Sequence, residues 1–187
     1  MRVAIGMLAH SGWAALVVLG RQDTDVVVVD RRRIELIEEA WAKHPYHAAE
    51  GLNASEARDV VQRGIEAAHR IAVREMQAEV ERERSRRNQI AGCAVLVGNP
   101  MPNWSIEEVI AVHFRMHKAE GVLFRDALLR ASENCGLKTH AIAEPLILTR
   151  KEKESKLLTR LGKTVGAPWG KDQKDAATAA LIALTVD

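Results

Sequence analysis

Three short apolar runs, rich in β-branched residues and separated only by short polar turns, open the chain and constrain its fold more than any other feature. They cover Val3–Met7, Ala14–Leu19 and Val26–Asp30. Runs of this length bounded by turn residues are typical of strands, and such short connections allow only antiparallel pairing. The sequence therefore predicts a three-stranded meander. Valines 26–29 predict a third strand buried on both faces, and the arginines 31–33 predict that the chain then leaves the sheet and starts a helix.

Helical and strand patterns alternate after the meander. Apolar residues at every third or fourth position predict a long amphipathic helix from Asn53 to about Asn88, with Asn53 and Glu56 as a capping box. The elements expected next are strands over Ala91–Val97 and His140–Ala143 and helices over Ser105–Ala131, with a second capping box, and Asp172–Leu184. Parallel strands need crossover connections, so the order β-β-β-α-β-α-β-α predicts an α/β fold with one five-stranded mixed sheet and helices on both faces.

Composition limits the class of protein. The 187 residues carry 27 Lys and Arg against 25 Asp and Glu, so the net charge of +2 gives no argument for nucleic-acid binding by the whole surface. A chain of this size buries about 70% of its surface on folding, enough for one core, and we expect a single domain over residues 1–187. Two cysteines and the lack of a long apolar run predict a cytoplasmic protein without disulfides or a membrane span.

Four strings resemble those of the ribonuclease H-like superfamily, in its RuvC-type Holliday-junction resolvase branch, which has the same element order. They are Val3–Met7 followed by Gly12-Trp13-Ala14, Lys118–Gly121, Glu144-Pro145 with the lysines after it, and the segment from Asp172 to Ala183. The last is the most specific, because two aspartates three residues apart precede a run of small residues. The resemblance implies a ribonuclease H-like fold and a nucleic-acid partner, DNA or RNA.

The resemblance also implies a two-metal nuclease site, from which expected carboxylates are missing. Met7 stands where the family has its first metal-binding aspartate, and Asn99 follows the fourth strand where the family has a glutamate. Magnesium and manganese require oxygen ligands, which leaves Asp172 and Asp175 as catalytic candidates and Glu144 as a further metal ligand. We therefore expect a degenerate site with weak or no binding of these ions. Met7→Asp is expected to restore binding if Met7 occupies the lost position.

A basic segment is the second candidate site. Residues 138–174 hold nine basic residues against four acidic ones, the only sizeable local excess of charge. Such a concentration fits a phosphate backbone. The candidate phosphate-binding residues are Lys151, Lys153, Lys156, Lys171 and Lys174. The alternative is a solvated surface, and Asp172 and Asp175 have an equally plain alternative as acids that stabilise the start of a helix by about 0.3–1 kcal/mol.

The histidines give a weaker signal. His113 and His117 lie four apart on a predicted helix but lack the glutamate of the zinc-protease signature. His44 and His47 form a loop pair without a third ligand nearby in sequence. We expect all four to be surface or partly packed residues.

Three functions follow from these observations. The first is a RuvC-like protein that binds nucleic acid and has a decayed two-metal site. The second is an active metal-dependent endonuclease with a rearranged site built from Asp172 and Asp175 with Glu144 or Glu35. The third is a non-catalytic homodimeric module that uses the long helix as its interface.

Overall fold

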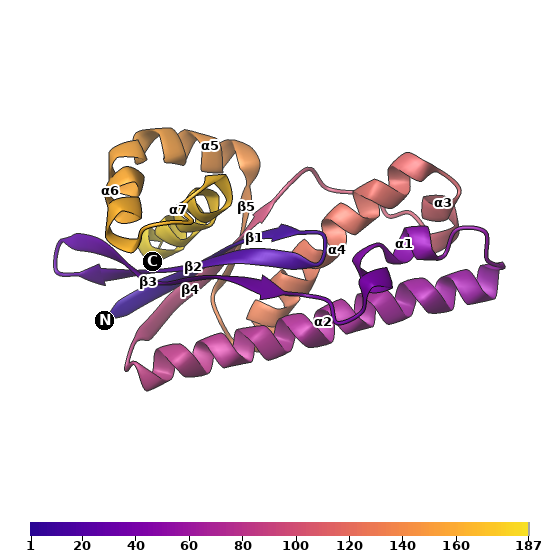
Figure 1. The fold of residues 1–187 in the computed structure, drawn as a ribbon, viewed down its shortest axis with the longest axis horizontal. Helices are drawn as coiled ribbons and strands as arrows, with labels where there is room; N and C mark the ends of the chain where they lie inside the picture. Colours follow the sequence, from indigo (N-terminus) through magenta and orange to yellow (C-terminus); the bar gives the residue numbers. More distant parts are fainter. Residues whose placement is uncertain (187) are drawn as a thin grey trace.

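A five-stranded mixed sheet forms the centre of the protein, whose computed structural model describes residues 1–186. The strands, in the order β3-β2-β1-β4-β5, are β1 (Arg2–His10), β2 (Trp13–Gln22), β3 (Asp25–Glu35), β4 (Gln89–Val97) and β5 (Thr139–Ala143). β2 pairs antiparallel with β1 and β3, and β4 pairs parallel with β1 and β5. The predicted meander and mixed sheet are confirmed (Figure 1).

Helices cover both faces of this sheet, as predicted. One face carries the long helices α2 (Ala54–Ser85) and α4 (His113–Asn134), and the other carries α7 (Lys171–Thr185) with α5 (Glu144–Lys153) and α6 (Ser155–Val165) beside it (Figure 1). The short elements η1 (Ala40–Lys43), α1 (Pro45–Ala48) and α3 (Ile106–Ile110) pack at the end of α2 and α4. Within residues 1–186, no helix is long and apolar enough to cross a membrane.

Side chains alternate along β1 and pack into two separate hydrophobic cores, one on each face of the sheet. Ile5 and Met7 pack into the core under α2 and α4, whereas Ala4 and Leu8 pack under α7. Gly6 lies on the α7 side, where a Cβ would overlap the backbone of that helix. The small residues of α7 and this glycine therefore let the helix lie directly on β1, which brings its first turns next to the tip of the strand.

The third strand differs from expectation in two ways. Valines 26–29 are half-buried rather than buried on both faces, because β3 is an edge strand that pairs only with β2. The strand also continues through the three arginines to Glu35 instead of giving way to a helix. These arginines have structural partners: Arg31 donates to the carbonyls of Gly166 and Ala167, both at 2.8 Å, and Arg32 pairs with the buried Glu79.

The helix boundaries follow the capping residues. Asn53 caps α2, accepting hydrogen bonds from the backbone N–H groups of Ser55 and Glu56 at 3.1 and 3.0 Å. The capping box of Ser105 and Glu108 is present, but it starts only the five-residue α3. The chain then becomes extended at Val112 before α4 begins, so the single helix predicted from Ser105 is two helices. This break sets the first turns of α4 beside α1.

Candidate functional site

A hollow of about 350 Å³ lies where the carboxyl ends of β1, β4 and β5 meet the start of α7. The residues that line it come from β1 and its turn, β4 and the residue after it, α4, α5 and α7: Leu8, Ala9, His10, Ser11, Leu96, Gly98, Gly121, Arg125, Glu144, Ile147, Leu148, Lys171 and Asp175. Adjacent parallel strands end at one edge of a sheet, which is why segments so distant in sequence converge here. The sequence predicted this convergence of strand tips and closing helix.

Asp175 is the buried carboxylate of the hollow, and two lysines hold it. Its side chain is 4% exposed. Lys151 Nζ lies 2.6 Å from Oδ1 and Lys171 Nζ lies 2.9 Å from Oδ2, so each oxygen has its own ammonium group. The hydrogen bond to Asp175 raises the pKa of Lys171. Two of the five lysines predicted to bind phosphate are thus the counter-ions of a predicted metal ligand.

Of the other candidate carboxylates, Glu144 shares the hollow with Asp175, whereas Asp172 and Glu35 do not line it. Asp172 lies one turn earlier on α7, with Oδ2 3.2 Å from His10 Nε2, and it is not part of the lining. Neither aspartate is the N-cap, which is Gly170. Glu144 lines the hollow from the first turn of α5. Glu35, at the end of β3, is paired with Arg33 at 2.5 Å and lies outside the lining.

Met7 and Asn99 do not face the hollow, which corrects their predicted placement. Met7 is completely buried in the core on the opposite side of the sheet, and its neighbour Leu8 lines the hollow instead. Asn99 is exposed in the loop after β4, and Gly98 occupies the lining. Because side chains alternate along a strand, an offset of one residue moves a side chain to the other face. The substitution that would place a carboxylate in the hollow is therefore Leu8→Asp, not Met7→Asp.

Arg125 is a residue of the hollow that sequence reasoning missed. It comes from α4, donates from Nε to the carbonyl of Gly121 at 2.5 Å and lies against Gly98, where a Cβ would approach its Nη1. Burial lowers the pKa of Arg125, and the charges of Asp126 and Glu144 oppose this shift. No sequence signal separates it from the other arginines, because only the packing of α4 against β4 brings it here.

The lining offers few oxygen ligands for a pair of divalent ions. Two such ions bring four positive charges and need several oxygen ligands. Glu144 and Asp175 supply the carboxylates of the lining, and both oxygens of Asp175 are already bound to lysine ammonium groups. Arg125 adds a further positive charge. The positions at the strand tips, Leu8 and Gly98, offer no side-chain oxygen.

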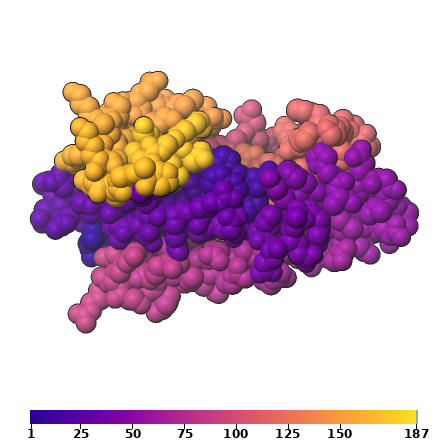
Figure 2. Space-filling model, in the orientation of Figure 1, coloured from indigo at the N-terminus to yellow at the C-terminus, as the bar shows by residue number. Residues whose placement is uncertain are grey.

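Exposed basic residues continue from the hollow over the neighbouring helices. Among residues 1–186, the side chains of Lys153, Lys156 and Lys174 make no ion pair; Lys153 and Lys156 are exposed and open to a ligand, whereas Lys174 is half-buried. Lys156, Arg160 and Lys163 line a shallow groove of about 350 Å³ along α6, together with Ser155 and Thr159. Figure 2 shows the residues of α5, α6 and α7, in orange and yellow, as a layer above the first strands.

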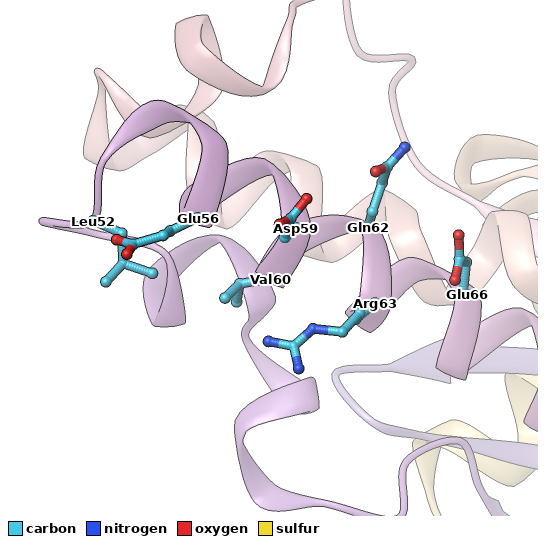
Figure 3. Close-up of a pocket in the computed structure, with 7 residues that line it drawn as sticks. All are labelled: Leu52, Glu56, Asp59, Val60, Gln62, Arg63 and Glu66. Atoms are coloured by element: carbon cyan, nitrogen blue, oxygen red, sulfur yellow. The ribbon is translucent and has the colours of Figure 1, made fainter.

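A larger hollow, of about 670 Å³, lies on the N-terminal half of α2 and has the opposite charge. Its lining is Leu52, Glu56, Asp59, Val60, Gln62, Arg63 and Glu66, and Figure 3 shows these side chains spread along the helix instead of converging on one point. Three acids against one arginine do not favour a phosphate group. Its charged and polar side chains also offer no continuous apolar surface for a helix partner.

His44, His47, His113 and His117 are exposed or half-buried, as expected, but they are not independent of one another. His44, His47, His113 and His117 meet in one cluster with the buried Glu120, where α1 packs against α4. The break at Val112 produces this arrangement, which the spacing of the histidines in the sequence did not indicate.

Comparison with known proteins gives a likeness in fold. No protein-family model matches the chain, and neither does any curated protein sequence. RuvC of T. thermophilus in complex with a Holliday junction substrate aligns with a TM-score of 0.51 and 14% identity over 97% of this chain and 91% of that chain. A second structure of Thermus thermophilus RuvC aligns with a TM-score of 0.48 and 14% identity over 96% and 91%. The likeness to the junction-bound structure shows that the chain has a ribonuclease H-like fold of the RuvC type.

Proposed function

We propose that this protein binds the phosphodiester backbone of DNA or RNA and does not cleave it. The binding surface comprises the hollow at the tips of β1 and β4 and the basic outer face of α5 and α6. One observation carries the proposal: Asp175, the buried acid of the hollow, has a lysine ammonium group on each oxygen. Lysines thus supply the positive charge that metal ions supply in a two-metal nuclease.

The charges of the hollow favour an anionic ligand. Arg125 and Lys171 in the lining balance Asp175 and Glu144, and Lys151, which reaches Asp175 from α5, adds a third positive charge. The groove of α6 adds Lys156, Arg160 and Lys163, of which Arg160 is shared with Asp25 at 3.2 Å. Binding to phosphates releases counter-ions from the nucleic acid, so several such contacts add affinity without any base contact. The solved RuvC structure bound to a Holliday junction supports a four-way junction as the first ligand to test.

The test is the salt dependence of binding to labelled four-way junction, duplex DNA and RNA–DNA hybrid, followed by fluorescence anisotropy. The variant Lys156→Ala/Lys163→Ala removes two exposed charges from the groove. Each lost phosphate contact lowers the slope of log K against log salt by about 0.9, so we expect a decrease of about 2. The matched control, Lys43→Ala/Arg63→Ala, removes two exposed charges from η1 and α2 and leaves the slope unchanged. Equal slopes for wild type and the groove variant would contradict the proposal.

The alternatives predict different results in the same experiments. A rearranged endonuclease built on Asp175 and Glu144 predicts cleavage with magnesium or manganese that Asp175→Asn abolishes. A homodimeric module predicts a stable dimer in sedimentation and no binding of nucleic acid at any salt concentration.

Both cysteines are free thiols, which supports a cytoplasmic location for the proposed activity.

A further inference from the structure

Three histidines at the start of α4 and in α1 are arranged as ligands around one point. The ring centroid of His47 lies 5.1 Å from that of His113 and 4.6 Å from that of His117. The Nε2 atoms of His113 and His117 are 3.0 Å apart. One nitrogen from each of the three rings lies within 4.8 Å of the other two. His113 and His117 are exposed and His47 is half-buried, so the cluster is open to solvent on one side.

The spacing of these nitrogens is close to that of ligands on a single ion. Zinc binds histidine at about 2.0–2.1 Å in tetrahedral geometry, which puts two ligand nitrogens about 3.3–3.4 Å apart. The separation of 3.0 Å between His113 and His117 requires only a small adjustment to reach this value. Because they lie one helical turn apart on α4, the helix itself fixes this pair.

Glu120 prepares His47 to act as a ligand. Its side chain is 2% exposed, and its Oε1 accepts hydrogen bonds from His47 Nδ1 at 2.8 Å and from the His47 backbone N–H at 3.2 Å. A carboxylate can only accept, so the proton of His47 lies on Nδ1 and the lone pair lies on Nε2. A carboxylate behind a ligating histidine is the arrangement that orients such ligands in metal sites. Its negative charge also offsets the partial positive charge at the start of α4, which would otherwise oppose a cation.

We propose that His47, His113 and His117 bind a divalent transition-metal ion of the zinc type, with a fourth position open to water. Imidazole ligands favour zinc, copper, nickel or iron over magnesium, so this site is chemically distinct from a two-metal nuclease site. The ion would link the short helix α1 to α4, although α2, β4 and α3 separate these two helices along the chain. The inference does not depend on nucleic-acid binding.

A second grouping, His44 with His47 and Glu120, fits an ion less well. It uses the Nδ1 atoms of both histidines, which already donate to the two oxygens of Glu120 at 2.9 and 2.8 Å. A metal there would displace both protons and break both hydrogen bonds. The grouping with His113 and His117 keeps these hydrogen bonds intact.

The test is a zinc titration of the tag-free full chain. Bound metal is first removed with a chelator, the chelator is removed, and zinc is then added in competition with a chromogenic zinc indicator. We expect one equivalent to bind, and His113→Ala and His117→Ala each to weaken binding at least 100-fold. Both residues are exposed, so these variants are expected to fold. Glu120→Gln keeps the stoichiometry and weakens binding about 10–100-fold, as loss of an orienting carboxylate does. His69→Gln, on α2 outside the cluster, is the matched control and leaves affinity unchanged.

Two further readouts connect binding to this geometry. Cobalt in place of zinc is expected to give the intense visible absorption of a four-coordinate site in wild type and not in His117→Ala. Zinc is expected to raise the melting temperature of wild type and not of His117→Ala, because a ligand bound to the folded state stabilises it. Absence of zinc binding to the wild type would overturn the proposal. So would binding that survives in His113→Ala and His117→Ala, or that His69→Gln weakens as much as they do.

Discussion

Replacing Lys151 with methionine tests the pairing at Asp175, on which the proposed function rests. Methionine keeps much of the apolar stem and removes the ammonium group that lies 2.6 Å from Oδ1. The Asp175 side chain is 4% exposed and that of Lys151 is 25% exposed, so water compensates poorly for the loss. Lys171 keeps its own contact with Oδ2 at 2.9 Å, but its side chain is 71% exposed and screened.

The expected loss can be bracketed from these contacts. A hydrogen bond to a charged group contributes about 1.5–3 kcal/mol, and breaking a buried pair costs about 3–5 kcal/mol. Because Lys171 remains, we expect Lys151→Met to lower the free energy of unfolding by about 2–3 kcal/mol. The assay is urea denaturation, in which the midpoint should fall while the slope stays constant.

A double-mutant cycle isolates the pair from other effects of the substitution. Lys151→Met, Asp175→Asn and the double variant should give a coupling energy within the range of about 0.5–3 kcal/mol found for residues in contact. Lys153→Met is the control, since Lys153 is exposed on the same helix and makes no ion pair among residues 1–186. A coupling energy near zero, or an equal effect of both lysine substitutions, would refute the reasoning.

Four further predictions follow from the packing. Gly6→Ala should lower the free energy of unfolding by about 1–3 kcal/mol or more, because its Cβ would overlap the backbone of α7. Gly121→Ala in α4 should have little effect. Thermal melts of the two variants measure the difference. Met7→Asp should lower the free energy of unfolding by more than about 4 kcal/mol or prevent folding, because it buries an unpaired charge. Leu8→Asp should fold, and a manganese titration should show tighter binding than in wild type. Weaker or equal binding by Leu8→Asp would count against the assigned face. Burial raises the pKa of the Cys93 thiol to about 12, so a thiol reagent at pH 8 should label Cys135 and spare Cys93 until the protein unfolds. The raised pKa keeps the proton on folded Cys93, while the thiol of the unfolded chain loses it as pH rises above about 9. Cys93 should therefore lower the free energy of unfolding above this pH. Urea denaturation of wild type and Cys93→Ala at pH 8 and pH 10 would measure the effect.

The strands and the long helices α2 and α7 were predictable because their signals are local, whereas α5 and α6 were not predicted. The capping residues Asn53 and Ser105 mark helix starts that the structure confirms. The burial of β3 was not predictable in the same way. Four valines in a row fit a central strand and an edge strand equally, and only the strand order distinguishes them.

The site residues depend on contacts that the sequence does not contain. An excess of lysines indicates a basic segment, but Lys151 is the partner of an acid 24 positions away, whereas Lys153 is exposed. Met7 and Leu8 differ only in the face of β1 to which each belongs, and the packing of α7 decides which face holds the hollow. The histidine cluster needs the break at Val112, for which the spacing gave no sign.

The affinity for a labelled four-way junction, measured in EDTA and again in magnesium or manganese, tests the central claim most directly. With lysines already neutralising Asp175, the account predicts the same dissociation constant in all three buffers at matched ionic strength, and a junction that remains intact. Binding that appears only with a divalent ion, or cleavage products that Asp175→Asn eliminates, would contradict it.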